Sequence, residues 1–196
     1  MPRIPGVATK DASPLIRAGY WIAKRRYKVV PEPFTVLARH RKLFMTAARH
    51  EMAAEKACRT LPKNVLELAV YRVAQQIGCS WCVDFGTELQ KHSGLDVERL
   101  KHIDDYRTSP TYTKQERLAV AYADAMSTMP VSVTDEQVAE LRQEFGDEAL
   151  LELTYQIGIE NMRARMFSAL DIRDQGFSSG DACRLPEAEI TARTDA

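Results

Sequence analysis

The 196-residue sequence has no long apolar run, and no stretch approaches the roughly 20 residues that a helix needs to cross a bilayer. Its first residues also lack the apolar stretch and cleavage site of a signal peptide. Glycine and proline number only nine each, while 45% of the residues are hydrophobic. This composition excludes a disordered chain and predicts one folded domain with a sizeable core. We therefore expect a cytoplasmic protein.

Net charge is lacking as well, because 27 Lys and Arg residues balance 27 Asp and Glu residues. The whole chain thus offers no electrostatic argument for nucleic-acid binding. Residues 1–60 nevertheless carry 13 basic and 4 acidic side chains, and residues 61–196 carry 14 and 23. We expect the basic first third to pack against the acidic remainder, within or between subunits. Contact with an acidic lipid or partner is the alternative.

Strict alternation of apolar and polar residues between hairpin turns is missing, so the sequence predicts an all-α fold. Helix starts are indicated at Ser13-Pro14 and by the capping boxes Thr113–Glu116 and Thr134–Gln137, and stops by Gly94 and Pro130. The expected helices cover residues 14–28, 33–40, 41–58, 63–77, 80–93, 96–102, 114–128, 135–144 and 147–171. Residues 103–112 and 172–196 are expected to be loops.

The expected helix at 147–171 has apolar residues around most of its circumference. Such a helix must be buried on all sides. A subunit interface would bury it, and so would a central position within one subunit; the sequence leaves both open. Glu160, Arg163 and Arg165 interrupt this helix, and we expect them to form a paired polar network at an interface, since buried charges need partners.

Cysteines are few, and two of the four stand three residues apart, at Cys79 and Cys82. When the first cysteine of such a pair opens a helix, the Cα atoms come within the ~4.4–6.8 Å that a disulfide requires. Gly78 is expected to end the preceding helix, so that Cys79 begins the next one. A helix N-terminus stabilises a thiolate, whose pKa can fall from ~8.5 to ~7 in such motifs. The pair is therefore a candidate redox centre.

Other interpretations of the pair remain. Two inert core cysteines would have the same spacing. A zinc site needs about four ligands, and no second pair of cysteines or histidines stands at ligand spacing. We expect neither a metal nor a cofactor.

Glu67 lies in the mostly apolar run from 64 to 77. If it faces inward, burial should raise its pKa, and it could carry a proton to or from a thiol. The alternative is a solvated glutamate near a helix start, where the helix dipole favours an acid.

Glu67, Cys79 and Cys82 at this spacing resemble the Glu…CxxC pattern of the AhpD-like alkylhydroperoxidase branch of the carboxymuconolactone decarboxylase family. The similarity extends to PEPFTVLARHRKLF at 31–44, LPKNVLELAVYRVAQQIGCSWCVDFGTEL at 61–89, YTKQERLAVAYADAMSTMP at 112–130 and LTYQIGIENMRARMFSALDI at 153–172. The resemblance implies an AhpD-like helical bundle over residues 31–172 that oligomerises through its helices. A basic helical segment at 1–30 would precede it, and a polar tail at 173–196 would follow.

The resemblance also implies a thiol-dependent peroxidase or disulfide oxidoreductase. One cysteine of the pair would be oxidised by a hydroperoxide, the other would resolve it to a disulfide, and a partner dithiol or small thiol would reduce that disulfide. By position, Cys79 and Cys82 would be the redox pair and Glu67 the proton-relay carboxylate. A non-catalytic, redox-sensing helical oligomer and a decarboxylase-like enzyme remain alternatives.

The sequence departs from the family at the general base. Well-studied AhpD-like members have a histidine four residues after the second cysteine, where this chain has Gly86, and Trp81 stands where they can have another. Asp84 is a weak substitute, and we expect it to be solvated or capping. His92 does not share the face of Cys82.

Three further side chains remain, and the first two have more than one interpretation. Trp81 could line a pocket for an organic peroxide or be a simple core aromatic. Cys183, in the tail, could reach the pair, form an intersubunit bond or remain an exposed, uncommitted thiol. Cys58, at a helix end, is expected to be structural.

Overall fold

The computed structural model describes residues 1–178, and every regular element in that part of the chain is helical, which confirms the all-α prediction. The elements are α1 (Pro14–Tyr27), α2 (Glu32–Leu37), α3 (Arg41–Ala57), α4 (Lys63–Ile77), α5 (Ser80–His92), the 3₁₀ helix η1 (Glu98–Asp105), α6 (Lys114–Ser127) and α7 (Asp135–Ala169). No helix within this region is both long and apolar enough to cross a membrane.

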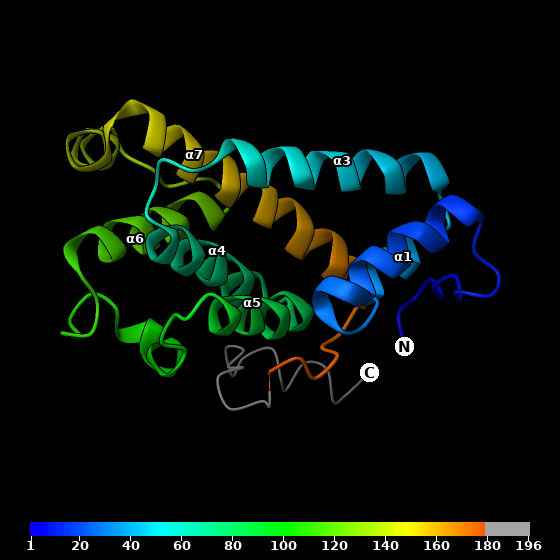
Figure 1. Ribbon diagram of the computed structural model, residues 1–196. Helices are drawn as coiled ribbons and strands as arrows, with labels where there is room; N and C mark the ends of the chain where they lie inside the picture. The colour runs from blue at the N-terminus through cyan, green and yellow to red at the C-terminus, as the bar shows by residue number, and fades with distance from the viewer. Residues whose placement is uncertain (179–196) are drawn as a thin grey trace.

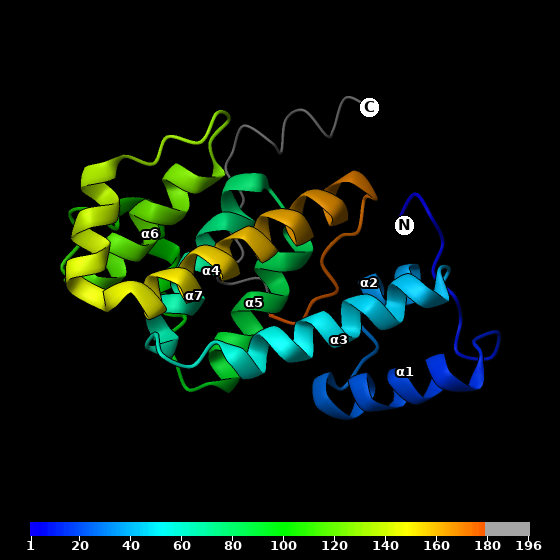
Figure 2. The ribbon, with the colours of Figure 1, turned by 90° about the horizontal axis from the view of Figure 1, so that it is seen from above.

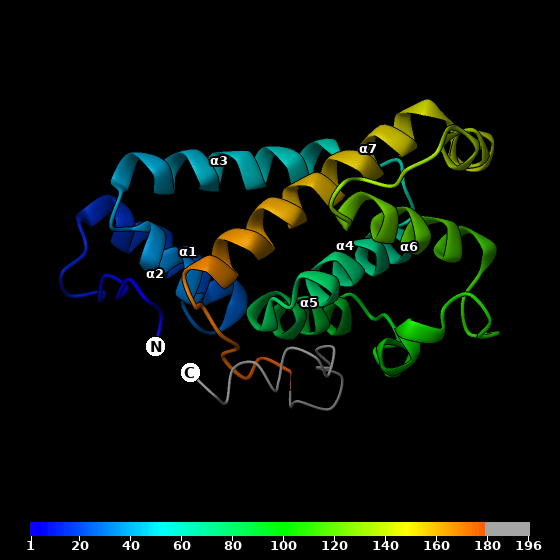
Figure 3. The same ribbon diagram turned by 180° about the vertical axis from the view of Figure 1, so that it is seen from behind.

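Helix α4 is the centre of the bundle, since it packs against α5, α6 and α7 (Figure 1). The long helix α7 passes between α3 and the hairpin of α4 and α5 (Figures 1 and 3). On the far side of α3, α1 lies alongside it (Figure 2), and the pair is joined by an edge-to-face contact of Tyr20 with Phe44. Tyr20 and Phe44 belong to a small cluster of their own, apart from the two clusters around α4.

Local signals set most of the helix boundaries. Gly78 ends α4 in the left-handed conformation, with φ of 76°, which glycine adopts without steric cost. Thr113 and Glu116 form the predicted capping box at the start of α6. Thr134 accepts a hydrogen bond from the backbone of Gln137 at the start of α7, as the capping prediction required of that side chain.

One boundary prediction was wrong: residues 103–105 are not a loop, because η1 continues to Asp105. The division of residues 135–171 into two helices is confirmed, because α7 is broken at Gly146, whose φ of 80° is not helical. Residues 172–178 form no helix, as expected, but 174–178 are docked against α5 instead of being an extended tail, and 179–196 lie outside the described residues.

The sequence left open what buries the apolar circumference of α7, and the structure buries only one face of this helix within the monomer. Leu153, Ile157 and Phe167 are buried within the monomer, whereas Leu151 and Met162 are more than half exposed. One face therefore has its partners inside this chain, and the opposite face has apolar side chains in contact with solvent.

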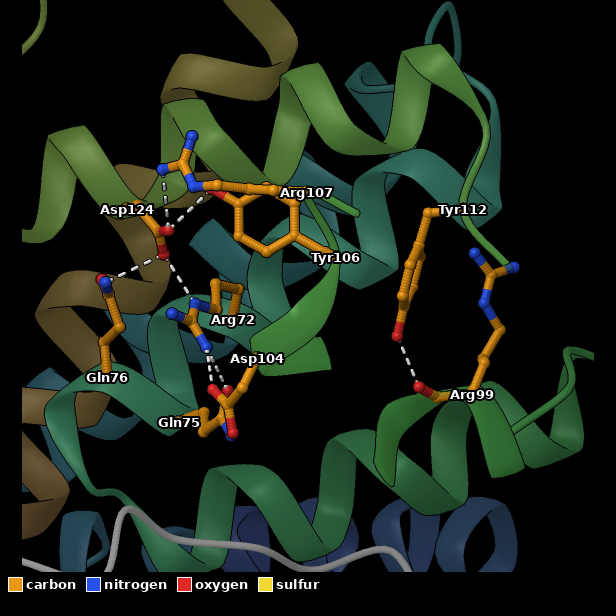
Figure 4. Close-up of polar contacts among 9 residues, drawn as sticks. All are labelled: Arg72, Gln75, Gln76, Arg99, Asp104, Tyr106, Arg107, Tyr112 and Asp124. Atoms are coloured by element: carbon orange, nitrogen blue, oxygen red, sulfur yellow. Dashed lines mark hydrogen bonds and ion pairs between the residues drawn. The ribbon is translucent and has the colours of Figure 1, made fainter. Parts of the chain in front are cut away.

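A polar network joins α4 to η1 and α6 on the side away from α3 (Figure 4). Arg72 lies 2.6 Å from a carboxylate oxygen of Asp124 and 2.6 Å from one of Asp104. Asp124 also accepts hydrogen bonds from Gln76 and Tyr106. Each buried charge in this network has several partners, so the network holds the three elements together without an unsatisfied ion.

The basic run at 24–28 is mostly exposed on the last turn of α1. Within it, Arg26 pairs with Glu55 of α3 at 2.7 Å, a contact inside the basic third of the chain. The basic first third was expected to pack against the acidic remainder, but no ion pair within residues 1–178 joins a basic side chain of residues 1–60 to an acidic side chain of residues 61–178.

Candidate active site

Cys79 and Cys82 are joined by a disulfide, with Cα atoms 5.3 Å apart. Cys79 is the N-cap of α5, as the sequence predicts, and its sulfur accepts a hydrogen bond of 3.2 Å from the backbone N–H of Cys82. The left-handed Gly78 releases the chain from α4, so the pair lies at the closed end of the α4–α5 hairpin. In the reduced protein, the same N–H and the helix dipole would stabilise a Cys79 thiolate.

The pair is shielded from solvent: Cys79 is 1% exposed and Cys82 is 8% exposed. Trp81, between them, stacks on Phe85 at 4.6 Å and meets Phe167 of α7 edge-on at 5.4 Å. Phe177 packs against both Trp81 and Phe85. Trp81 is thus part of a packed aromatic cluster beside the disulfide.

Asp84 is neither solvated nor a helix cap, so that prediction was wrong. It is 2% exposed and accepts hydrogen bonds of 3.0, 3.0 and 2.7 Å from the backbone N–H groups of Gln175, Phe177 and Ser178. The hydroxyl of Ser178 donates a fourth, of 2.9 Å. All of these partners come from residues that the sequence assigned to a loose tail.

We call residues 174–178 the strap. Besides its bonds to Asp84, the strap accepts a 2.9 Å hydrogen bond from Trp81 Nε1 at Gln175 and donates from the backbone of Asp174 to Ser80. These contacts cover the first turns of α5, and the segment that follows α7 runs along α5 in Figure 1. The strap therefore lies over the helix turn that carries the redox pair.

Glu67 is partly buried, and burial raises its pKa, although Lys63 and Arg163 oppose the shift. The side-chain amide of Gln90 lies 3.5 Å from the backbone carbonyl of Glu67 and places Glu67 opposite Gln90, eight residues beyond Cys82 on α5. Among the described residues, no hydrogen bond joins Glu67 to either cysteine. The proton-relay role of Glu67 therefore stays a prediction, and it needs intervening groups.

Tyr71 and Gly86 lie along the α4–α5 hairpin between the Glu67 and Gln90 pair and the disulfide. Tyr71 is one turn beyond Glu67, is buried, and belongs to the same apolar cluster as Cys79 and Cys82. A Cβ atom at Gly86 would lie 3.9 Å from the Tyr71 ring, an ordinary van der Waals distance. Position 86, where the resemblance to the AhpD-like pattern implies a histidine, thus has room for the first atom of a side chain.

Glu160 and Arg163, expected with Arg165 to form a paired network at an interface, are paired inside the monomer, and Arg165 is exposed. Arg163 pairs with Glu160 at 2.9 Å and with Glu51 of α3 at 3.0 Å. Glu160 is 4% exposed, and its pKa is raised to about 7, mainly by burial and further by the nearby Glu51 and Glu67. The sequence signal was an acid within a mostly apolar stretch of α7, but Glu51 and Glu67, which act on it, come from other helices.

The remaining sequence candidates are peripheral. Cys58 is a half-buried free thiol at the end of α3, and His92 is exposed and 3.0 Å from Glu88. Cys183 lies outside the described residues. In residues 1–178 no group of three or more His, Cys, Asp or Glu side chains is placed to hold a metal ion.

Most of the sequence is similar to that of a known protein. The chain is 33% identical over 173 residues to the uncharacterized protein YnjA of Escherichia coli (strain K12), covering 88% of this chain and 92% of YnjA. No family model matches it.

Solved structures share its fold. The debrominase Bmp8 superposes with a TM-score of 0.78 at 19% identity, covering 91% of this chain and 95% of Bmp8. A cysteine-to-alanine variant of Bmp8 has also been solved with 2,3,4-tribromopyrrole. A peroxidase-related protein of Ralstonia eutropha JMP134, an alkylhydroperoxidase AhpD core, superposes with a TM-score of 0.80 at 17% identity, covering 90% of this chain and 94% of that one.

Proposed function

This chain belongs to the AhpD-like, carboxymuconolactone decarboxylase family, and we propose that it is a cytoplasmic thiol-dependent peroxidase or disulfide oxidoreductase. The observation that carries the proposal is the Cys79–Cys82 disulfide at the N-terminus of α5. A buried pair at this position combines a stabilised thiolate with a second sulfur in bonding distance.

The reaction proceeds in two steps. The Cys79 thiolate attacks the outer oxygen of a hydroperoxide; an S–O bond forms, the O–O bond breaks, and the alkoxide leaves as an alcohol after taking up a proton. The Cys82 sulfur then attacks the sulfenic acid, the disulfide forms, and the oxygen leaves as water. Both electrons come from sulfur, and a partner dithiol or small thiol returns them by exchange.

Two further features support parts of this proposal. The raised pKa of Glu67 fits a carboxyl group that carries the proton to the alkoxide. The exposed apolar side chains Leu151 and Met162 on α7 fit a homo-oligomer that assembles through this helix.

The test is to reduce the full chain, add one equivalent of cumene hydroperoxide, and follow the intact mass and a peptide map with time. We expect a loss of two hydrogens mapped to Cys79 and Cys82, which Cys79→Ser and Cys82→Ser both abolish. Gly86→His should oxidise several-fold faster, because an imidazole there supplies a base near pKa 6.5 between Glu67 and the pair. If both thiols stay reduced while a free-thiol control oxidises, the peroxidase function is wrong.

A second candidate is reductive dehalogenation, which the aromatic side chains beside the dithiol and the fold shared with Bmp8 favour. An aryl bromide and the two thiols would give the arene, the disulfide and hydrogen bromide, so that sulfur supplies both electrons. Bromide release from 2,3,4-tribromopyrrole by the reduced chain, absent in Cys82→Ser, would identify this activity.

A further inference from the structure

Glu160 is the exception in an otherwise apolar stripe of α7. The side chains that α7 turns toward the bundle at this level are Leu153, Ile157, Glu160, Ala164 and Phe167, and all five are buried. Leu153 and Ile157 belong to one apolar cluster, and Ala164 and Phe167 belong to the cluster that contains both cysteines. Burying a carboxyl group at this junction carries a large cost unless its charge is removed or paired.

The pairing at Glu160 is incomplete. One oxygen lies 2.9 Å from Arg163, and the other, Oε1, is buried with no hydrogen-bond partner in the described part of the chain. Arg163 also serves Glu51 at 3.0 Å, and its own Nε has no described partner. One guanidinium is therefore shared by two carboxylates, and the charge of a third, Glu67 of α4, lies near enough to shift the pKa values of both Arg163 and Glu160.

We infer that Glu160 is a second proton-holding residue of the redox site, which keeps a proton at neutral pH and passes it through Glu67 to the leaving alkoxide. This inference rests on the proposed peroxidase function. Glu160 acts here through another residue, so its role is that of a positioning and proton-storing group. The balance is simple: neutral Glu160 and an alkoxide become a Glu160 carboxylate and an alcohol, and solvent later returns the proton.

The surrounding charges favour this assignment. The groups that act on the cluster are Glu51 and Glu55 from α3, Lys63 and Glu67 from α4, Arg163 from α7 and Tyr27 at the end of α1. Burial is the largest effect on Glu160, the like charges of Glu51 and Glu67 act in the same direction, and Arg163 opposes them, so that its pKa is raised to about 7. A carboxyl group with this pKa is both donor and acceptor near neutral pH.

The two acids also lie on helix faces that lead to the disulfide. On α4, Glu67 is followed at helical spacing by Tyr71 and Ala74, and on α7, Glu160 is followed by Ala164 and Phe167. These followers all belong to the cluster of Cys79 and Cys82. The acidic cluster and the redox pair are thus at opposite ends of one packed region.

The first measurement is pH-difference infrared spectroscopy of the full chain. We expect a protonated-carboxyl band that titrates near pH 7, is lost in Glu160→Gln, and persists in Glu152→Gln. Glu152 is a matched control, since it is also a buried acid of α7 but accepts hydrogen bonds from the backbone N–H groups of residues 59, 60 and 61. A neutral-pH band that survives in Glu160→Gln would overturn the assignment.

The second measurement separates proton storage from structure. In wild type, the rate of disulfide formation with cumene hydroperoxide per thiolate should fall about tenfold per pH unit above the inflection near pH 7. Glu160→Gln should lose that inflection, and Glu51→Gln should move it to lower pH because a like charge is removed. An unchanged profile in Glu160→Gln would refute the relay. A band near pH 7 in a wild type that consumes no peroxide would instead refute the peroxidase function and leave the proton site standing.

Discussion

Two arginines of this molecule face similar acids with different results. Arg72, between α4 and α6, meets Asp104 and Asp124, and Asp124 has further donors in Gln76 and Tyr106 (Figure 4). Arg163, between α3 and α7, meets Glu51 and Glu160, yet both Arg163 and Glu160 keep a buried polar atom without a partner among the described residues.

The two networks differ in how completely their charges are paired, and this difference indicates a structural role for one and a functional role for the other. Around Arg72, every charged group has hydrogen-bonding or ionic partners, which is what a structural ion network requires, and the buried atom without a described partner is a neutral one, the amide oxygen of Gln76. Around Arg163, carboxylates outnumber the cationic and hydrogen-bond-donating groups. The network is therefore most stable when one carboxyl group holds a proton. An unbalanced buried network of this kind is a candidate functional site, because perturbed acids concentrate where protons move.

Removing the cation from the balanced network should have the largest effect. Arg72→Met leaves Asp124 partly buried without its closest partner, and we expect a loss of about 3 kcal/mol from the free energy of unfolding, at the low end for a broken buried pair because both side chains are partly exposed. Urea denaturation at pH 7 measures it. Peroxide-driven formation of the Cys79–Cys82 disulfide should be unchanged in the folded variant; a parallel loss of that chemistry would contradict the division between the two networks.

The pH dependence of stability should distinguish the unbalanced network. Glu160 titrates near 4.5 when unfolded and at about 7 when folded. Between these values the folded chain holds a proton that the unfolded chain has lost, so the contribution of Glu160 to stability is highest below pH 4.5 and falls by up to about 3 kcal/mol as the pH rises to 7. Glu160→Gln should therefore gain stability relative to wild type between pH 5 and pH 8, as measured by urea denaturation.

Glu152 provides the opposite sign. Burial raises its pKa, but hydrogen bonds from the backbone of Leu61, Thr60 and Arg59 outweigh burial, and the net shift is downward. Its contribution is fully present above the unfolded pKa and is lost as the pH falls through the folded one. Glu152→Gln should consequently be most destabilising at neutral pH. If both variants show the same trend with pH, the contrast between satisfied and unsatisfied buried acids is wrong.

A smaller effect is expected where the strap meets α5. Asp84→Asn replaces a carboxylate that accepts four hydrogen bonds, so the strap should dissociate more often and expose the pair. We expect iodoacetamide to alkylate the reduced Cys79 and Cys82 about tenfold faster, an effect of about 1.4 kcal/mol. Asp174→Asn is the control, since only the backbone of Asp174 has a described contact with α5. Equal rates in the two variants and wild type would show that the strap does not limit access.

Much of the site could be predicted because its determinants are local. The turn at Gly78, the capping position of Cys79 and the spacing of Cys82 are decided within a few residues, and helix start chemistry follows from them. Asp84 was misjudged for the converse reason: its partners, Gln175 and Ser178, lie more than 90 residues away. A polar tail composition gives no signal that the backbone of the tail will meet a buried acid.

The sequence by itself determined an all-α chain and placed the cysteine pair at a helix N-terminus, because periodicity, caps and spacing act over one or two helical turns. It left the orientation of Glu67 open. Only the tertiary structure decided which charges are compensated. It brought Glu51, Glu67 and Glu160 from three helices around Arg163, and it laid the strap over α5. Burial and electrostatic coupling depend on distances in space, and helices that are remote in sequence set those distances.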